Sequence, residues 1–172
     1  MTDRPSAGPD RVRHLYLEVI PERTAAEAGG FGKAATRRRG VAVAATFDAH
    51  SGFRMFRGDE CACLVVHLQR AAQVVGYNCV GFDYELIHGR IPFKRPETID
   101  LMQVASQGLA RPLSLMQAVR PALGDIPVPS VDAIWEAVAG RQWREVGIQL
   151  RERLRIFALL HAHHFPGTPM AG

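Results

Sequence analysis

The stretch that decides the fold reads Val74-Val75-Gly76-Tyr77-Asn78-Cys79-Val80-Gly81-Phe82-Asp83-Tyr84-Glu85-Leu86. Its first four residues are apolar, which is typical of a strand buried on both faces of a parallel sheet. A loop begins at Asn78, the only asparagine in the chain, whose side chain can hydrogen-bond to stabilise it. Asp83 is expected to open a helix and to direct its carboxylate at the edge of the sheet. A turn asparagine followed by a helix-capping aspartate is the simpler interpretation of the same residues.

The remaining elements follow from apolar patterns and from turn residues. Residues 22–40, rich in glycine and arginine, are predicted to form a long surface connection. Asp59 is the expected N-cap of the first helix. The other predicted elements are strands over 14–20 (ending at Pro21), 41–47 and 52–57, and helices over 60–72, 112–122, 131–138 and 143–161, while 98–102 fits a strand or a helix start.

This order predicts an α/β domain with a mixed central sheet and helices on both faces. An antiparallel meander of three strands precedes a crossover helix and a buried parallel strand, which is the order of a ribonuclease H-like (RNase H-like) three-layer domain. With 172 residues the chain has room for one domain, predicted over 13–165. Residues 1–12 are expected to be a flexible leader, and residues 166–172 a flexible tail.

Composition restricts the possible partners and compartment. The chain has 21 basic and 17 acidic residues, a net charge of +4, which permits a polyanionic partner such as DNA or RNA. Three cysteines are too few for a disulfide framework, so a cytoplasmic location is expected. The apolar runs are far shorter than the roughly 20 residues that span a bilayer, which argues against a membrane partner.

Two segments resemble the DEDD superfamily of 3'-5' exonucleases. The stretch that ends at Asp83 looks like the second motif of that superfamily. In it an apolar strand is followed by Asn78, three further residues, an aromatic residue and Asp83. Residues 22–31, Glu-Arg-Thr-Ala-Ala-Glu-Ala-Gly-Gly-Phe, followed after nine residues by the strand at 41–48, are similar to a bacterial branch of it. The resemblance covers roughly residues 13–162. It implies an RNase H-like domain that hydrolyses phosphodiester bonds with two divalent cations, Mg²⁺ or Mn²⁺, held by four carboxylates.

The same resemblance implies the site residues. It places Glu18, Asp83 and Glu152 at three of the four catalytic, metal-binding acidic positions, and Ile20 at the fourth. Ile148 stands where the superfamily has its tyrosine or histidine base. An isoleucine offers no oxygen to a hard cation such as Mg²⁺, so the expected site is degenerate and binds metal weakly or not at all.

Several alternatives remain open for this site. Three carboxylates can hold a single metal ion, and Glu22 can replace the missing ligand if the first strand ends early. Arg151, Arg153 and Arg155 flank Glu152, and one or more of them can pair with the acids where a metal ion would otherwise lie.

Arg37, Arg38 and Arg39, together with Asn78, are the candidate nucleic-acid contacts. The arginine triplet can contact phosphates, or it can belong to a solvated loop.

Three functions are compatible with these features. The first is an exonuclease-like domain with weakened or lost catalysis that binds nucleic acid or a protein. The second is an active Mg²⁺-dependent 3'-5' exonuclease that uses Glu18, Asp83 and Glu152. The third is a structural subunit that contacts proteins and no nucleic acid.

Overall fold

The central strand of the molecule is β1 (Val12–Pro21), in a computed structural model that describes residues 12–167. Five strands form one sheet in the order β3-β2-β1-β4-β5. On one side of β1 lies the antiparallel pair β2 (Val41–Asp48) and β3 (Gly52–Arg57). This half of the sheet is the meander that the turn residues predict, because residues 49–51 connect its two strands as a hairpin.

The other side of β1 is parallel. The strands β4 (Ala71–Gly76) and β5 (Thr98–Asp100) run in the same direction as β1, with Leu17 opposite Gly76 and Gly76 opposite Asp100. The carboxyl ends of β1, β4 and β5 therefore meet at one edge of the sheet. In open α/β sheets this edge is where functional groups gather.

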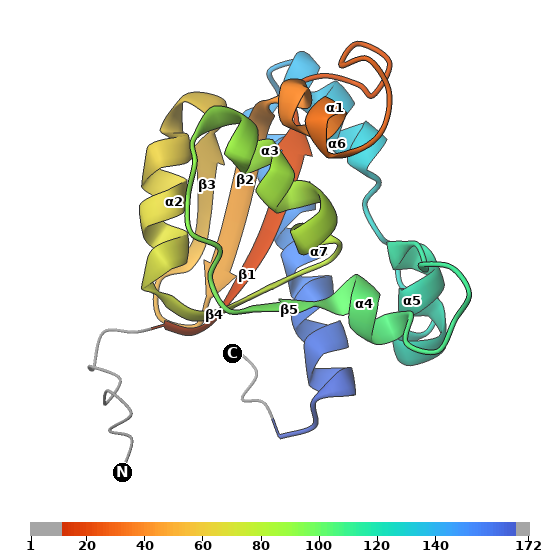
Figure 1. Cartoon of the computed structure of the whole chain (residues 1–172). Coiled ribbons are helices and arrows are strands. Elements are labelled where there is room, and N and C mark those ends of the chain that lie inside the picture. The colour runs from red at the N-terminus through yellow and green to blue at the C-terminus, as the bar shows by residue number, and fades with distance from the viewer. Residues whose placement is uncertain (1–11, 168–172) are drawn as a thin grey trace.

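Helices cover both faces of the sheet (Figure 1). A 3-10 turn, η1 (Gly58–Glu60), and a π-helical turn, η2 (Cys79–Asp83), precede two of these helices. The helices are α1 (Lys33–Arg39), α2 (Cys61–Arg70), α3 (Tyr84–Arg90), α4 (Leu101–Ala105), α5 (Leu115–Leu123), α6 (Val131–Ala139) and α7 (Trp143–His164).

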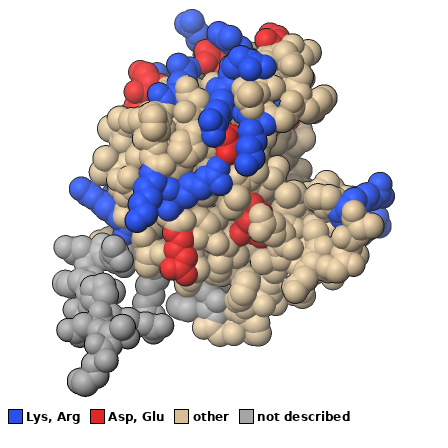
Figure 2. Space-filling model, in the orientation of Figure 1, with Lys and Arg blue, Asp and Glu red and all other residues tan. Residues whose placement is uncertain are grey.

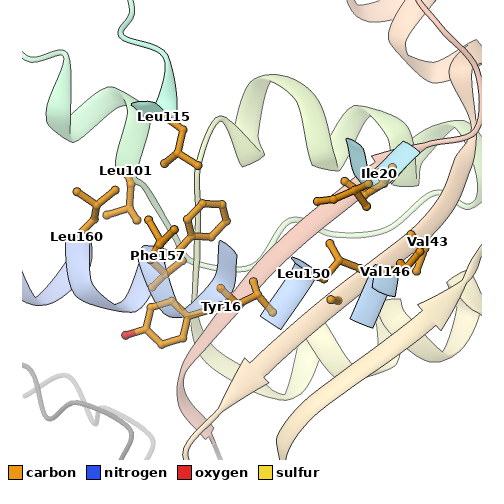
Figure 3. Close-up of a cluster of buried hydrophobic side chains, with 14 of the residues drawn as sticks. Tyr16, Ile20, Val43, Leu101, Leu115, Val146, Leu150, Phe157 and Leu160 are labelled. Carbon is orange, nitrogen blue, oxygen red and sulfur yellow. The ribbon is translucent and has the colours of Figure 1, made fainter. Parts of the chain in front are cut away.

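The alternation of side chains along β1 divides the interior into two cores. Leu15, Leu17 and Val19 pack with α2 and α3 on one face. Tyr16 and Ile20 point to the other face and pack against α4–α7, as Figure 3 shows. Glu18 lies between these two residues in the strand, so its side chain points toward α7.

The predicted fold class is confirmed: the chain has an α/β fold with a mixed five-stranded sheet and helices on both faces, which is compatible with an RNase H-like fold. Residues 98–102, which fit a strand or a helix start in the sequence, contain both, since β5 ends at Asp100 and α4 begins at Leu101. Asp59 does not cap α2. It lies inside η1, where the N–H of Arg57 donates instead to Glu60 Oε2 at 2.8 Å.

The surface connection predicted at 22–40 contains a helix, α1. The glycines before it suggest a loop, but residues 33–39 have only ordinary helix formers and pack against α3. The two helices approach closely at Gly89 of α3, where an added Cβ would lie 2.0 Å from the carbonyl oxygen of Arg37. A glycine is therefore required at this crossing.

The expected leader and tail lie outside the described residues, except for Val12, which begins β1, and residues 166 and 167. No helix among residues 12–167 is long and apolar enough to cross a membrane.

Candidate functional site

A buried ion pair joins the central strand to the last helix. Arg153 of α7 donates from Nη2 to Glu18 Oε1 of β1 at 3.0 Å. Its Nη1 donates to the carbonyl oxygen of Pro129 at 2.7 Å, just before α6. The side chains of Arg153 and Glu18 are only 8% and 7% exposed. The guanidinium is thus fixed between β1 and the start of α6.

Helical periodicity explains why Arg153 faces the sheet. Val146, Leu150, Leu154 and Phe157 form the buried stripe of α7. Arg153 follows Leu150 by three positions and precedes Phe157 by four, which places it on the same face. The sequence prediction that one of the arginines around residue 152 pairs with an acid of the site is confirmed for Arg153.

Asp83 lies at the end of η2 and is buried beside this pair. Its Oδ2 has no hydrogen-bond partner among the described residues. The pKa of Asp83 is raised well above its usual value, first by burial and then by the negative charges of Glu18 and Asp100. Burial also raises the pKa of Glu18, although the Arg153 guanidinium opposes this rise. Two acids therefore share one cation, and Asp83 binds a proton at a higher pH than an exposed aspartate does.

Asp100, which the sequence analysis did not single out, holds the loop that carries Asp83. Its Oδ1 accepts the backbone N–H groups of Asn78 at 2.9 Å and Met102 at 3.1 Å, and its Oδ2 accepts the N–H of Val80 at 3.0 Å. Asn78 contributes a left-handed backbone conformation, with φ of 59°. The sequence signal that could have identified Asp100 is its place between a short strand and a helix, because an aspartate there often caps the helix.

A cleft opens over these residues, with a volume of about 540 Å³. Glu18, Asp83 and Arg153 form its polar floor. Tyr77 donates from its hydroxyl to the carbonyl oxygen of Leu113 at 2.9 Å, and burial raises its pKa to about 12, so the phenol stays neutral. The remaining lining residues are mostly apolar or small: Val19, Arg39, Asn78, Phe82, Met102, Leu113, Ser114, Leu115, Met116, Val128, Pro129, Ser130 and Val131.

The structure brings Glu18 and Asp83 together but does not bring Glu152 to them. Glu152 is two residues from both Leu150 and Leu154, so it turns away from the sheet and pairs with Arg155 at 2.6 Å. That hydrogen bond lowers the pKa of Glu152. Glu152 therefore takes no part in the cluster of Glu18, Asp83 and Arg153 in this structure.

The two degenerate positions also fall outside the cleft lining. Ile148 is 54% exposed on α7 and does not face the acids. Ile20 is fully buried in the core between β1 and α7. An aliphatic side chain at this position extends the hydrophobic interior right up to Glu18.

The arginine triplet lies on a basic face of the molecule. Figure 2 shows Lys and Arg side chains gathered over α1, α3 and the segment that follows α3. Arg37 Nε donates to Glu85 Oε2 at 2.7 Å, Arg38 Nε to the carbonyl oxygen of Ala28 at 3.0 Å, and Arg39 Nε to that of Arg23 at 2.8 Å. The triplet is therefore helical and not part of a loop, and Arg37 and Arg38 are exposed to solvent. Arg39 reaches the cleft, where its guanidinium lies 5.0 Å from the centre of the Phe82 ring.

As arranged, these residues do not fit a pair of divalent cations. A guanidinium carries only hydrogen-bond donors and a positive charge, so Arg153 repels a metal ion at Glu18. Asp100 already accepts three backbone N–H groups. Within residues 12–167, no group of three or more His, Cys, Asp or Glu side chains is arranged to hold a metal ion.

Comparison with known proteins supports the class of fold. Among solved structures the chain is similar to the family B DNA polymerase from the hyperthermophilic archaeon Pyrobaculum calidifontis, with a TM-score of 0.61 and 14% sequence identity. The match covers 95% of this chain but only 27% of that polymerase chain. No protein-family model and no curated protein matches the sequence. At this identity the similarity shows the fold alone.

Proposed function

We propose that this domain binds nucleic acid, DNA or RNA, without cleaving it. In this proposal an exonuclease-type RNase H-like domain has exchanged metal-dependent catalysis for binding. The single observation that carries the proposal is the buried ion pair between Arg153 and Glu18 in the cleft.

The ion pair argues against two-metal hydrolysis on chemical grounds. Two Mg²⁺ ions require several free carboxylate oxygens in near-octahedral geometry. Here one of the two carboxylates of the cleft is bound to a guanidinium, and the neighbouring position on β1 is the buried Ile20. Binding a metal ion would first require breaking a buried ion pair, which typically costs about 3–5 kcal/mol.

The surroundings of the cleft favour an anionic, aromatic ligand. Tyr77 and Phe82 line it together with the cation of Arg39, whereas the charge of Arg153 is balanced by Glu18. Aromatic side chains beside a positive surface are the usual means of binding single-stranded nucleic acid without sequence preference. The similarity to a DNA polymerase, a protein that acts on DNA, is consistent with such a partner.

Two measurements on the full chain test the proposal. Fluorescence anisotropy with labelled single-stranded and 3'-recessed DNA and RNA should show binding that weakens as salt rises. Incubation of the same substrates with Mg²⁺ or Mn²⁺ should leave them intact. If the unaltered protein digests these substrates and the Asp83→Ala variant does not, the protein is an active exonuclease and the proposal is overturned. Absence of binding even at low salt would favour a structural subunit that contacts only proteins.

A rebuilt variant gives a positive control for the metal argument. Arg153→Asp replaces the cation by a third carboxylate beside Glu18 and Asp83. Calorimetry should detect Mg²⁺ binding only in this variant. Equal Mg²⁺ binding by the unaltered protein would contradict the argument from the ion pair.

A further inference from the structure

Phe31 is the most exposed aromatic residue among those described, with 95% of its surface accessible. It precedes α1 and lies between Gly30, with φ of 108°, and Gly32, with φ of 100°. Both glycines have a left-handed backbone that other residues rarely adopt. The chain therefore turns on either side of Phe31 and presents the ring to solvent.

The loop that carries Phe31 is held by its own hydrogen bonds. The N–H of Gly30 donates to the carbonyl oxygen of Ala25 at 2.8 Å. Arg38 and Arg39 of α1 donate to the carbonyl oxygens of Ala28 and Arg23 in the same loop. These contacts hold the loop as far as Gly30, the residue before Phe31.

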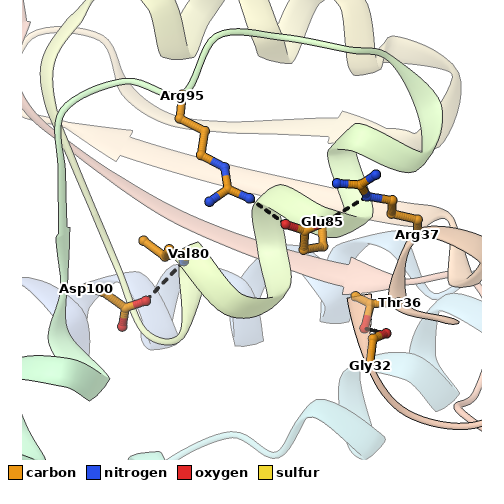
Figure 4. A network of polar contacts seen from close by, with 7 residues as sticks. All are labelled: Gly32, Thr36, Arg37, Val80, Glu85, Arg95 and Asp100. Atoms are coloured by element: carbon orange, nitrogen blue, oxygen red, sulfur yellow. Dashed lines mark hydrogen bonds and ion pairs between the residues drawn. The ribbon is translucent and has the colours of Figure 1, made fainter. Parts of the chain in front are cut away.

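Three cations lie around the buried carboxylate of Glu85, beside α1, the helix that Phe31 precedes. The carboxylate of Glu85 is fully buried, and it accepts hydrogen bonds from Arg37 of α1 and from Arg95 of the segment after α3 (Figure 4). Each arginine also keeps N–H donors that Glu85 does not use. The side chains of Arg37 and Arg95 are 50% and 38% exposed. Lys33 lies one helical turn before Arg37 on the same face of α1, so three cations stand against a single buried anion.

We propose that Phe31, Lys33, Arg37 and Arg95 form a second contact surface for single-stranded nucleic acid, outside the cleft. An unpaired base stacks on the Phe31 ring, and the backbone phosphates lie on the three cations. The surface fits a single strand because the bases of a duplex are stacked on one another and expose no face. This inference rests on the proposed function and adds the form of nucleic acid that is bound.

The stacking contact is tested by varying the ring and the bases together. Anisotropy is measured with an oligothymidine, with a strand of the same length made of abasic units, and with a duplex. Phe31→Ala should weaken binding of the oligothymidine about 5- to 150-fold, the range of one lost base–aromatic contact. It should leave binding of the abasic strand unchanged, and Phe31→Trp should restore the affinity. Leu109→Ala, which also removes an exposed apolar side chain, is the matched control and should change neither affinity.

The phosphate contact is tested by the salt dependence. Lys33→Gln should weaken binding of the oligothymidine and of the abasic strand alike. It should also reduce the slope of log affinity against log salt by about 0.7, the value for one phosphate on a single strand. Arg70→Gln removes an exposed cation at the end of α2 and serves as the control. It should leave the slope unchanged.

The outcomes separate this inference from the proposed function. If the unaltered protein binds the oligothymidine but Phe31→Ala binds it equally well, the second surface is refuted while the proposed function stands. If Phe31→Ala lowers the affinity for the oligothymidine and for the abasic strand equally, stacking of a base on Phe31 is also refuted. If the unaltered protein binds no nucleic acid at low salt, both proposals fail, and a protein partner becomes the occupant to seek at Phe31.

Discussion

Replacing Arg153 by methionine removes the cation that pairs with Glu18 and lies beside Asp83. Methionine keeps most of the length and the apolar stem of the arginine side chain, but not the guanidinium, which lies 5.8 Å from the centre of the Phe157 ring. The variant loses the 3.0 Å bond to Glu18 and the 2.7 Å bond to the carbonyl oxygen of Pro129. Glu18 and Asp83 are then buried together with no positive charge between them.

The size of the effect depends on pH. With Glu18 ionised, losing one partner of a buried ion pair reduces the free energy of unfolding by about 3–5 kcal/mol. When Glu18 is protonated, the remaining loss is the hydrogen bond to Pro129, about 1 kcal/mol. Burial already raises the pKa of Glu18 in the presence of Arg153, and removing the arginine raises this pKa further. The deficit of the variant is therefore small below the pKa of an unfolded glutamate and grows as the pH rises through the raised folded pKa.

Urea unfolding of both proteins at about pH 4.5 and pH 8 measures this difference. Arg155→Met is the matched control, because Arg155 lies on the same helix and forms an exposed ion pair with Glu152. It should lower the free energy of unfolding by less than about 0.5 kcal/mol at either pH. A loss for Arg153→Met that is the same at both pH values, or no larger than that of the control, would refute the assignment of a buried, charged pair.

Three further substitutions probe the surroundings of the pair. Asp83→Asn should stabilise the protein at neutral pH, by about 1.4 kcal/mol for each unit by which the folded pKa of Asp83 is raised, and the gain should vanish near pH 4; urea unfolding across that range measures it. Asp100→Ala leaves three backbone N–H groups without their acceptor and should lower the free energy of unfolding by about 3 kcal/mol, with loss of amide protection in hydrogen exchange at Asn78. Glu152→Ala should change the free energy of unfolding by less than about 0.5 kcal/mol and leave nucleic-acid affinity unchanged in anisotropy; a larger loss of stability or affinity would return Glu152 to the site.

Local patterns predicted most of the fold. The apolar run at 74–77 and the strand before Pro21 place two central strands, and the parallel pairing of β1 with β4 brings Glu18 and Asp83 to one edge. Helix α1 was missed because its neighbours, not its own residues, look like a loop. The packing of α1 on α3 through Gly89 depends on residues about 50 positions apart, which no local pattern contains.

The motif match and the helical pattern of α7 disagree at Glu152. Matching a short motif placed Glu152 in the site, whereas the apolar stripe of α7, predicted correctly from Leu150 and Leu154, puts Arg153 on the buried face. One residue along a helix is a rotation of about 100°. Asp100 was harder to find, since its role depends on N–H groups of a loop some 20 residues earlier.

The crossing at Gly89 makes the spacing of two helices depend on the absence of a single methyl group. Alanine at this position would meet the carbonyl oxygen of Arg37 at 2.0 Å, so α1 would have to move outward or α3 would have to tilt. Either movement changes the distance between Arg37 of α1 and Glu85 of α3, which form an ion pair. The distance between the backbones of α1 and α3 at Gly89 therefore determines where Arg37 lies on the basic surface of the domain.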